Sequence, residues 1–216
     1  MVVAYTAGSI PQYRNILTDD ERLAYIREKV FESLTDDLVL WVARHIVSSC
    51  PSRDEDCEIN AIYGAVKNGP IPLPTEKGTR YLPALRYVEK QAGKNGLRFV
   101  EDMRDIDNYP TAGRILRWIA EGANGEDCDG HVILICSLLH AIGYQTGAII
   151  ASMDGKDFTH IFPVVGVPRR DPKNWIALDT TVPEARPGWM PGAGYGVKKM
   201  RVYAFVVDAP LVGRDL

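Results

Sequence analysis

The chain has 216 residues, 46% of them hydrophobic and 25% charged, a composition that suits one globular protein with a core large enough to need no disulfide staples. Its net charge of -3 supplies no basic surface for nucleic acid, and no stretch reaches the roughly 18 apolar residues of a membrane span. The first residues lack the apolar run of a secretory signal, so we expect a cytoplasmic protein.

Three helices are predicted in the first third of the chain. Thr18 is a suitable N-cap for a helix over residues 19–34, whose first turn is acidic. A second helix is predicted over residues 36–50, where apolar side chains recur at helical spacing. A third is predicted over residues 58–69, ended by the prolines of "PIPLP". His45, in the second helix, has no acidic neighbour in sequence and is interpreted as structural.

Two interpretations of Cys50 and Cys57 stand side by side. They bracket the segment "CPSRDEDC" and can pair under oxidising conditions. Two free thiols are the favoured interpretation, because four cysteines are too few for a disulfide scaffold and the expected compartment is reducing.

The middle of the chain is rich in glycine, proline and charge. Helices are predicted over residues 80–93 and 111–123, and residues 97–105 between them fit a strand or an extended arm. Two further stretches, residues 67–83 and 186–199, are interpreted as surface loops, with the lining of a groove as the alternative.

The last third predicts a helix followed by a sheet. Residues 131–142 are apolar nearly all round, which is typical of a helix buried in a core, and Gly143 is a natural end. Four strands are expected to follow, and short loops between neighbours favour antiparallel pairing. Helices that precede strands in this way indicate the α+β class. The four strands are predicted over residues 147–152, 158–165, 174–181 and 201–209.

Period-2 alternation along these strands brings together a histidine and an aspartate. His160 shares a strand face with Phe162, and Asp179 shares one with Ala177. We expect both faces to turn toward the buried helix. A buried carboxylate is costly without a partner, and His160 is the obvious one for Asp179. A helix that begins near Cys128 then delivers a thiol to the other imidazole nitrogen, giving a nucleophile, a base and an orienting acid.

Cys128 lies between two aspartates at the head of the predicted helix. The helix dipole stabilises an anion there by roughly 0.3 to 1 kcal/mol, which is less than one pKa unit and which neighbouring acids can cancel. Asp127 fits the N-cap and Asp129 the acidic first turn. A reactive thiolate at this position therefore requires a nearby imidazolium. The competing interpretation is a small buried cysteine and a core histidine with no chemistry.

A zinc site is also conceivable from the spacing of Cys128, His131, Cys136 and His140. On a continuous helix these positions spread over about half the circumference, so they do not converge on one tetrahedral ion. We therefore expect no metal. Cys136 is interpreted as core, His140 as a cap at the helix end, and His131 as a residue near the rim of the thiol site.

Three segments of the chain resemble the transglutaminase-like superfamily of cysteine enzymes. They are "GEDCDGHVILICSLLHAIGYQTGAII", "THIFPVV" and "WIALDTTVPEARPGW". The resemblance covers roughly residues 58–189 and implies a papain-like core, in which a helix with the nucleophile packs on an antiparallel sheet. Pro163 departs from the pattern, because proline interrupts a strand ladder, and it predicts an edge strand or a bulge. The resemblance implies an N-terminal helical extension over residues 1–57 and a catalytic domain over residues 58–216.

The same resemblance assigns Cys128 as nucleophile, His160 as base and Asp179 as orienting acid. It implies acyl transfer at an amide of a protein or peptide, with hydrolysis of the protease or amidase type favoured and no cofactor. The oxyanion donors are expected to be the Cys128 backbone N–H and a second group. Candidates for that second group are Asn108, Tyr109 and Asn124.

Two alternatives to hydrolysis remain open from the sequence. One is cross-linking of the transglutaminase type, in which an amine takes the place of water. The other is a non-catalytic structural or assembly module, for example of a phage particle, in which the N-terminal helices form an assembly surface.

Overall fold

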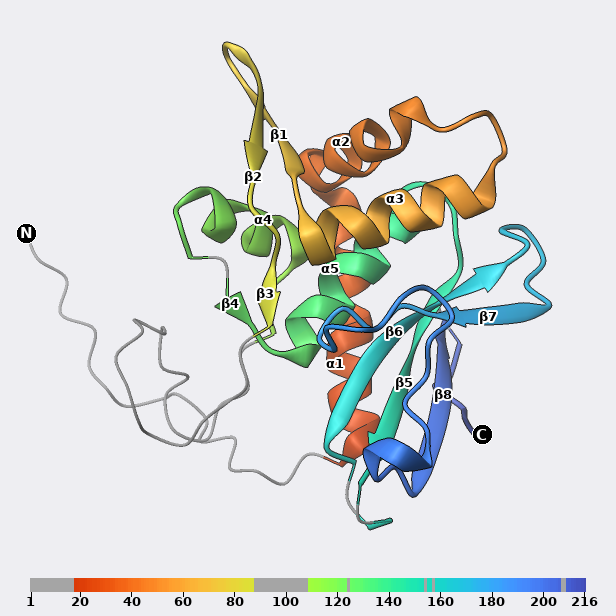
Figure 1. The fold of residues 1–216 in the computed structure, drawn as a ribbon. Coiled ribbons are helices and arrows are strands. Elements are labelled where there is room, and N and C mark those ends of the chain that lie inside the picture. The colour runs from red at the N-terminus through yellow and green to blue at the C-terminus, as the bar shows by residue number, and fades with distance from the viewer. Residues whose placement is uncertain (1–17, 88–108, 124, 154, 157, 207–208) are drawn as a thin grey trace, which may run out of the picture.

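The computed structural model describes residues 18–87, 109–123, 125–153, 155–156, 158–206 and 209–216. It confirms the α+β class. Figure 1 shows α5 near the centre of the molecule, with the other helices and a curled antiparallel sheet around it. None of the helices in the described part of the chain is long and apolar enough to cross a membrane.

Five α-helices are present in the described residues, and all five correspond to predicted helices in place and order. The helix over residues 80–93 is absent from the described part of that range, where residues 80–82 and 86–87 are strands. Residues 97–105 lie outside the described ranges. The helices are α1 (Asp19–Glu32), α2 (Asp37–Ile46), α3 (Glu55–Asn68), α4 (Ala112–Ala120) and α5 (Cys128–Ala141), with short 3-10 turns at Ser33–Thr35, Val47–Ser49 and Ala193–Tyr195.

The main sheet has five antiparallel strands in the order β7-β6-β5-β8-β9. Four of these were predicted, and the short edge strand β9 was not. The strands of the main sheet are β5 (Thr146–Ser152), β6 (His160–Val167), β7 (Asn174–Ala177), β8 (Lys199–Phe205) and β9 (Gly213–Asp215).

Two smaller strand pairs lie between α3 and α5 in the chain. An antiparallel hairpin projects from the molecule where the sequence suggested a loop or a groove lining (Figure 1). A two-residue parallel pair joins the chain before the start of α5 to the segment after the hairpin. The strands are β1 (Ile71–Thr75), β2 (Gly78–Leu82), β3 (Arg86–Tyr87) and β4 (Gly125–Glu126).

The predicted helix ends are formed by the expected groups. Thr18 and Glu21 make a reciprocal capping box at the start of α1, with Glu21 Oε2 accepting from Thr18 N at 2.7 Å. Gly143, with φ of 91°, follows the end of α5 in the left-handed region that favours glycine. Both signals fixed the ends of elements that were predicted correctly.

The core is built around α5. Residues 130–139 of this helix are all buried, as expected for a helix that is apolar all round. Buried residues of α1, α2 and α3 belong to the same cluster as α5 and one face of the sheet. The opposite face forms a second cluster around Ile149, Phe162 and Val164. The N-terminal helices therefore share one core with the rest of the chain.

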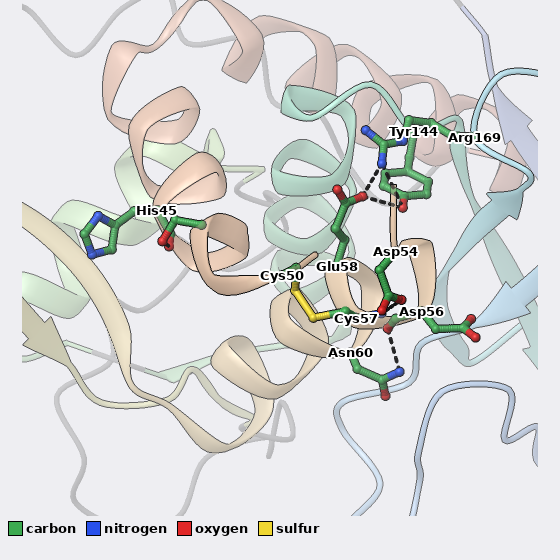
Figure 2. Close-up of a disulfide and its surroundings, with 10 residues drawn as sticks. His45, Cys50, Asp54, Asp56, Cys57, Glu58, Asn60, Tyr144 and Arg169 are labelled. Atoms are coloured by element: carbon green, nitrogen blue, oxygen red, sulfur yellow. Dashed lines mark hydrogen bonds and ion pairs between the residues drawn. A yellow bond between two sulfur atoms is a disulfide. The ribbon is translucent and has the colours of Figure 1, made fainter. Parts of the chain in front are cut away.

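Cys50 and Cys57 form a disulfide, so the favoured expectation of two free thiols is wrong. The turn between α2 and α3 brings their Cα atoms to 5.7 Å, within the range that a disulfide spans. Figure 2 shows the bridge beside the start of α3, where Asp54 caps the helix by accepting from Cys57 N at 2.9 Å.

One turn further along α3, an ionic cluster ties this helix to the end of α5. Glu58 accepts from Tyr144 Oη at 2.7 Å and forms an ion pair with Arg169 (Figure 2). Arg169 also donates at 3.0 Å to the carbonyl of Ile142, the residue that follows α5. The cluster thus joins α3, the end of α5 and the β6–β7 loop.

Candidate active site

Cys128 is the first residue of α5. Asp127 is the N-cap, as predicted, and its carboxylate accepts from Asp129 N at 3.1 Å and Gly130 N at 3.3 Å. The Cys128 side chain is half-buried, and its Sγ lies 3.9 Å from Asp129 Oδ1. The thiol is therefore held at the end of a rigid helix with partial access to solvent.

His160 and Asp179 form the hydrogen-bonded pair that the sequence predicts. The distance from His160 Nε2 to Asp179 Oδ2 is 2.8 Å, and 14% of the histidine side chain and 0% of the aspartate side chain are exposed. Burial alone would raise the pKa of Asp179. The hydrogen bonds and charge of His160 and the bonds from Thr181 outweigh it, so the pKa lies below its usual value. Asp179 is thus an ionised, buried carboxylate.

Thr181 satisfies the second carboxylate oxygen. Asp179 Oδ1 accepts from Thr181 Oγ1 at 2.7 Å and from Thr181 N at 2.9 Å. Because an ionised carboxylate only accepts hydrogen bonds, His160 Nε2 must donate to Oδ2. In the neutral imidazole this leaves the lone pair on Nδ1, the nitrogen that faces away from Asp179.

Pro163 releases the segment that carries Asp179 from the sheet. Its carbonyl accepts from Leu178 N at 2.9 Å, but proline has no N–H to return a bond. The β6–β7 pairing ends at Val164 and Ala177, and the chain then leaves the ladder. The expectation of an edge strand or a bulge is wrong, because β6 lies between β7 and β5 and pairs with β5 without a break in register through Pro163.

The strand face of His160 differs from the expected one. His160 packs beside Phe162, with ring centroids 5.6 Å apart, and Phe162 belongs to the cluster on the far side of the sheet from α5. Ile161 and Val165 face α5 instead. Period-2 alternation established correctly which residues share a face, but it carries no information on which face meets the helix.

His131 links the helix of Cys128 to the segment of Asp179. It lies one turn beyond Cys128, is 1% exposed, and its Nδ1 is 2.7 Å from Thr180 Oγ1. Burial lowers its pKa to about 4, so the ring is neutral at pH 7. The sequence placed His131 near the rim, and it is instead fully buried beneath the site.

Two side chains of α3 hold the backbone of the same segment. Tyr63 Oη lies 2.9 Å from Asp179 O and 2.7 Å from Ala185 O. Lys67 Nζ donates to Tyr63 Oη at 3.0 Å and to Val182 O at 2.9 Å. Neither α3 residue was singled out from the sequence, because their partners are backbone carbonyls far along the chain.

The three candidate catalytic residues are brought together to different degrees. His160 and Asp179 are directly bonded, and the Cys128 thiol lies beside Asp129 Oδ1 at the start of α5. His131, on the same helix as Cys128, contacts Thr180, the residue that follows Asp179. Sequence reasoning missed Thr181, although a hydroxyl two residues after an aspartate is a common hydrogen-bond partner of its carboxylate.

Of the oxyanion candidates, one lies in the described part of the chain. Tyr109 stacks on Tyr25 of α1, with ring centroids 6.2 Å apart, and packs against the core. Asn108 and Asn124 lie outside the described residues. The second oxyanion donor therefore stays a prediction.

The remaining cysteine and histidines of the sequence analysis have structural surroundings. Cys136 is buried, as expected, and donates to Gly147 O at 3.4 Å. His140 does not cap α5 with its ring, which packs on Phe31 at 5.1 Å instead. His45 stacks on Trp41 with ring centroids 4.5 Å apart, in keeping with the structural role expected for it.

The chain matches no protein-family model, no curated protein and no solved structure.

Proposed function

We propose that the chain is a cysteine-dependent acyl-transfer enzyme of transglutaminase-like, papain-like type that acts on an amide of a protein or peptide. The observation that carries the proposal is the His160–Asp179 bond at 2.8 Å, in which Nε2 donates to the acid and leaves the lone pair of the neutral ring on Nδ1. The segment that carries Asp179 is tied through Thr180 and His131 to the first turn of the Cys128 helix. An orienting acid of this kind fixes the tautomer of a catalytic base.

In the proposed mechanism, His160 Nδ1 takes the proton of the Cys128 thiol and the thiolate attacks the amide carbon. The developing oxyanion is stabilised by the Cys128 backbone N–H at the helix start and by the second donor. The carbon–nitrogen bond then breaks, and the amine leaves with the proton from Nδ1.

The thioester is resolved by a second addition. Water gives its proton to Nδ1, adds to the thioester carbon and releases a carboxylic acid and the thiol. We favour this hydrolytic outcome, of the protease or amidase type. Asp179 stays ionised throughout and stabilises the imidazolium of each step.

The first test is the pH dependence of Cys128 alkylation by iodoacetamide, mapped by peptide mass. We expect the wild-type midpoint well below about 8.5, the value of a free thiol, because a nearby imidazolium stabilises the thiolate. In His160→Ala the midpoint should rise toward that value. The control is His45→Ala, which removes a histidine stacked on Trp41 and should leave the midpoint unchanged.

An identical midpoint in the wild type and His160→Ala would sink the proposal and favour a structural or assembly module. If the pair is established, peptide hydrolysis is measured against incorporation of a labelled amine into glutamine peptides. Faster amine incorporation would replace hydrolysis by cross-linking as the reaction.

A further inference from the structure

The segment that carries the acid, residues 179–185, here called the acid segment, lies outside any strand or helix. Asp179 nevertheless has 0% of its side chain exposed and keeps a pKa below its usual value. A buried carboxylate on irregular backbone keeps its partner only if that backbone is held by other groups.

The backbone of the acid segment is held from α3. Tyr63 and Lys67 are four residues apart, so they lie on the same face of the helix. Tyr63 Oη reaches the carbonyls of Asp179 and Ala185, at 2.9 and 2.7 Å. Lys67 Nζ reaches the carbonyl of Val182 at 2.9 Å and that of Ala185.

The donors of this pair are fully used. An ammonium has three N–H groups, and Lys67 directs them at Tyr63 Oη, Val182 O and Ala185 O. The Tyr63 hydroxyl accepts from Lys67 and shares its one proton between two carbonyls. Burial and the charge of Asp179 raise the pKa of Tyr63 to about 12, so this proton is retained at pH 7.

We propose that Tyr63 and Lys67 are positioning residues that hold the acid segment so that Asp179 keeps His160 in place. This inference rests on the proposed function, because it assigns the pair a role in orienting the base. The hydrogen bonds that these two side chains make within the described structure go to each other and to backbone carbonyls of the acid segment. A displacement of the acid by about 1 Å is enough to weaken a catalytic arrangement strongly.

The test uses the full chain with its four histidines labelled with ¹⁵N, each ring assigned by substitution. The variants are Tyr63→Phe, which removes one oxygen, and Lys67→Met, which removes the ammonium and keeps the length of the side chain. The control is Tyr144→Phe, since the hydroxyl of Tyr144 also bonds to α3, through Glu58, and its partners in the described structure, Glu58 and Arg169, lie outside the acid segment.

In both variants we expect the His160 Nε2–H proton to exchange with water about tenfold faster, as for the loss of one buried hydrogen bond. Tyr144→Phe should leave this exchange as in the wild type. Unchanged exchange in folded Tyr63→Phe overturns the inference, and this conservative variant decides the matter if Lys67→Met does not fold.

This measurement is independent of the thiol. Faster His160 exchange in the variants, together with Cys128 alkylation that ignores His160, would leave the positioning role in place and remove the proposed function. The reverse pattern, a Cys128 midpoint that depends on His160 together with unchanged His160 exchange in Tyr63→Phe, would retain the enzyme and overturn the positioning role.

Discussion

His140 is a half-buried histidine whose ring packs on Phe31, and its buried Nε2 atom has no hydrogen-bond partner among the described residues. Burial lowers its pKa to about 4 from 6.5, as it does for His131. Between these pH values the unfolded chain binds protons that the folded chain does not. The free energy of unfolding therefore falls as the pH drops through this window.

We predict that His140→Leu makes the protein less sensitive to acid. A pKa shift from 6.5 to about 4 corresponds to a loss on the order of 3 kcal/mol for the wild-type residue, and leucine takes up no proton. Urea unfolding at pH 7 and pH 4.5 measures the difference. An equal decline in the wild type and the variant would contradict the prediction.

Thr180 and Thr181 show why the site was only partly predictable at the level of residues. The chemistry of His160 and Asp179 pointed to their bond directly, because a buried carboxylate needs a donor. The hydroxyls of Thr180 and Thr181 do not need a buried partner, so the sequence does not indicate which group they bond to. Tyr63 and Lys67 resemble any pair of polar residues on one face of a helix. Their partners exist only once α3 lies against the acid segment.

At the level of elements, the disulfide fixes the connection between α2 and α3. It closes a loop of eight residues from Cys50 to Cys57. In the loop-entropy model this lowers the conformational entropy of the unfolded chain and raises the free energy of unfolding by about 2 to 3 kcal/mol. Disulfides persist in oxidising surroundings and are rare where thiols are kept reduced. The bridge is therefore unusual for the reducing compartment expected from the sequence.

We predict that the double variant Cys50→Ser and Cys57→Ser loses about 2 to 3 kcal/mol in the free energy of unfolding. A reducing agent should lower the stability of the wild type by a similar amount and leave the double variant unchanged. Urea unfolding with and without the reductant provides this internal control. A wild type indifferent to reduction would show that the bridge contributes nothing.

The hairpin of β1 and β2 was missed because of its prolines. Pro72 and Pro74 argued against a strand, because proline lacks the N–H of a ladder. They lie in β1, whose only partner among the described strands is β2. A two-stranded hairpin leaves one side of each strand unpaired, and there a proline breaks no bond. By contrast, α5 was predictable because its apolar character all round leaves few alternatives.

On the scale of the whole molecule, the N-terminal helices and the sheet share one core. Ile26 of α1 is 1% exposed and belongs to the same buried cluster as α5 and β5. We predict that Ile26→Ala lowers the free energy of unfolding by about 2 to 5 kcal/mol, as for other buried isoleucines.

A shared core also predicts that unfolding is a single transition. Calorimetry of Ile26→Ala and of Ile150→Ala, a matched change in β5, should show one peak that moves to lower temperature in both. Two peaks, with only the first moved by Ile26→Ala, would show that residues 18–57 unfold separately.

Ten successive buried residues in α5 have a consequence for how such a chain can diverge. Cys128 is the first residue of a helix that is packed on all sides, so the position of its thiol depends on the packing of the whole core. Substitutions that tune the sulfur by shifting this helix must also disturb the folded state. The surroundings of Cys128 can therefore be changed at lower cost in the loops than in the helix itself.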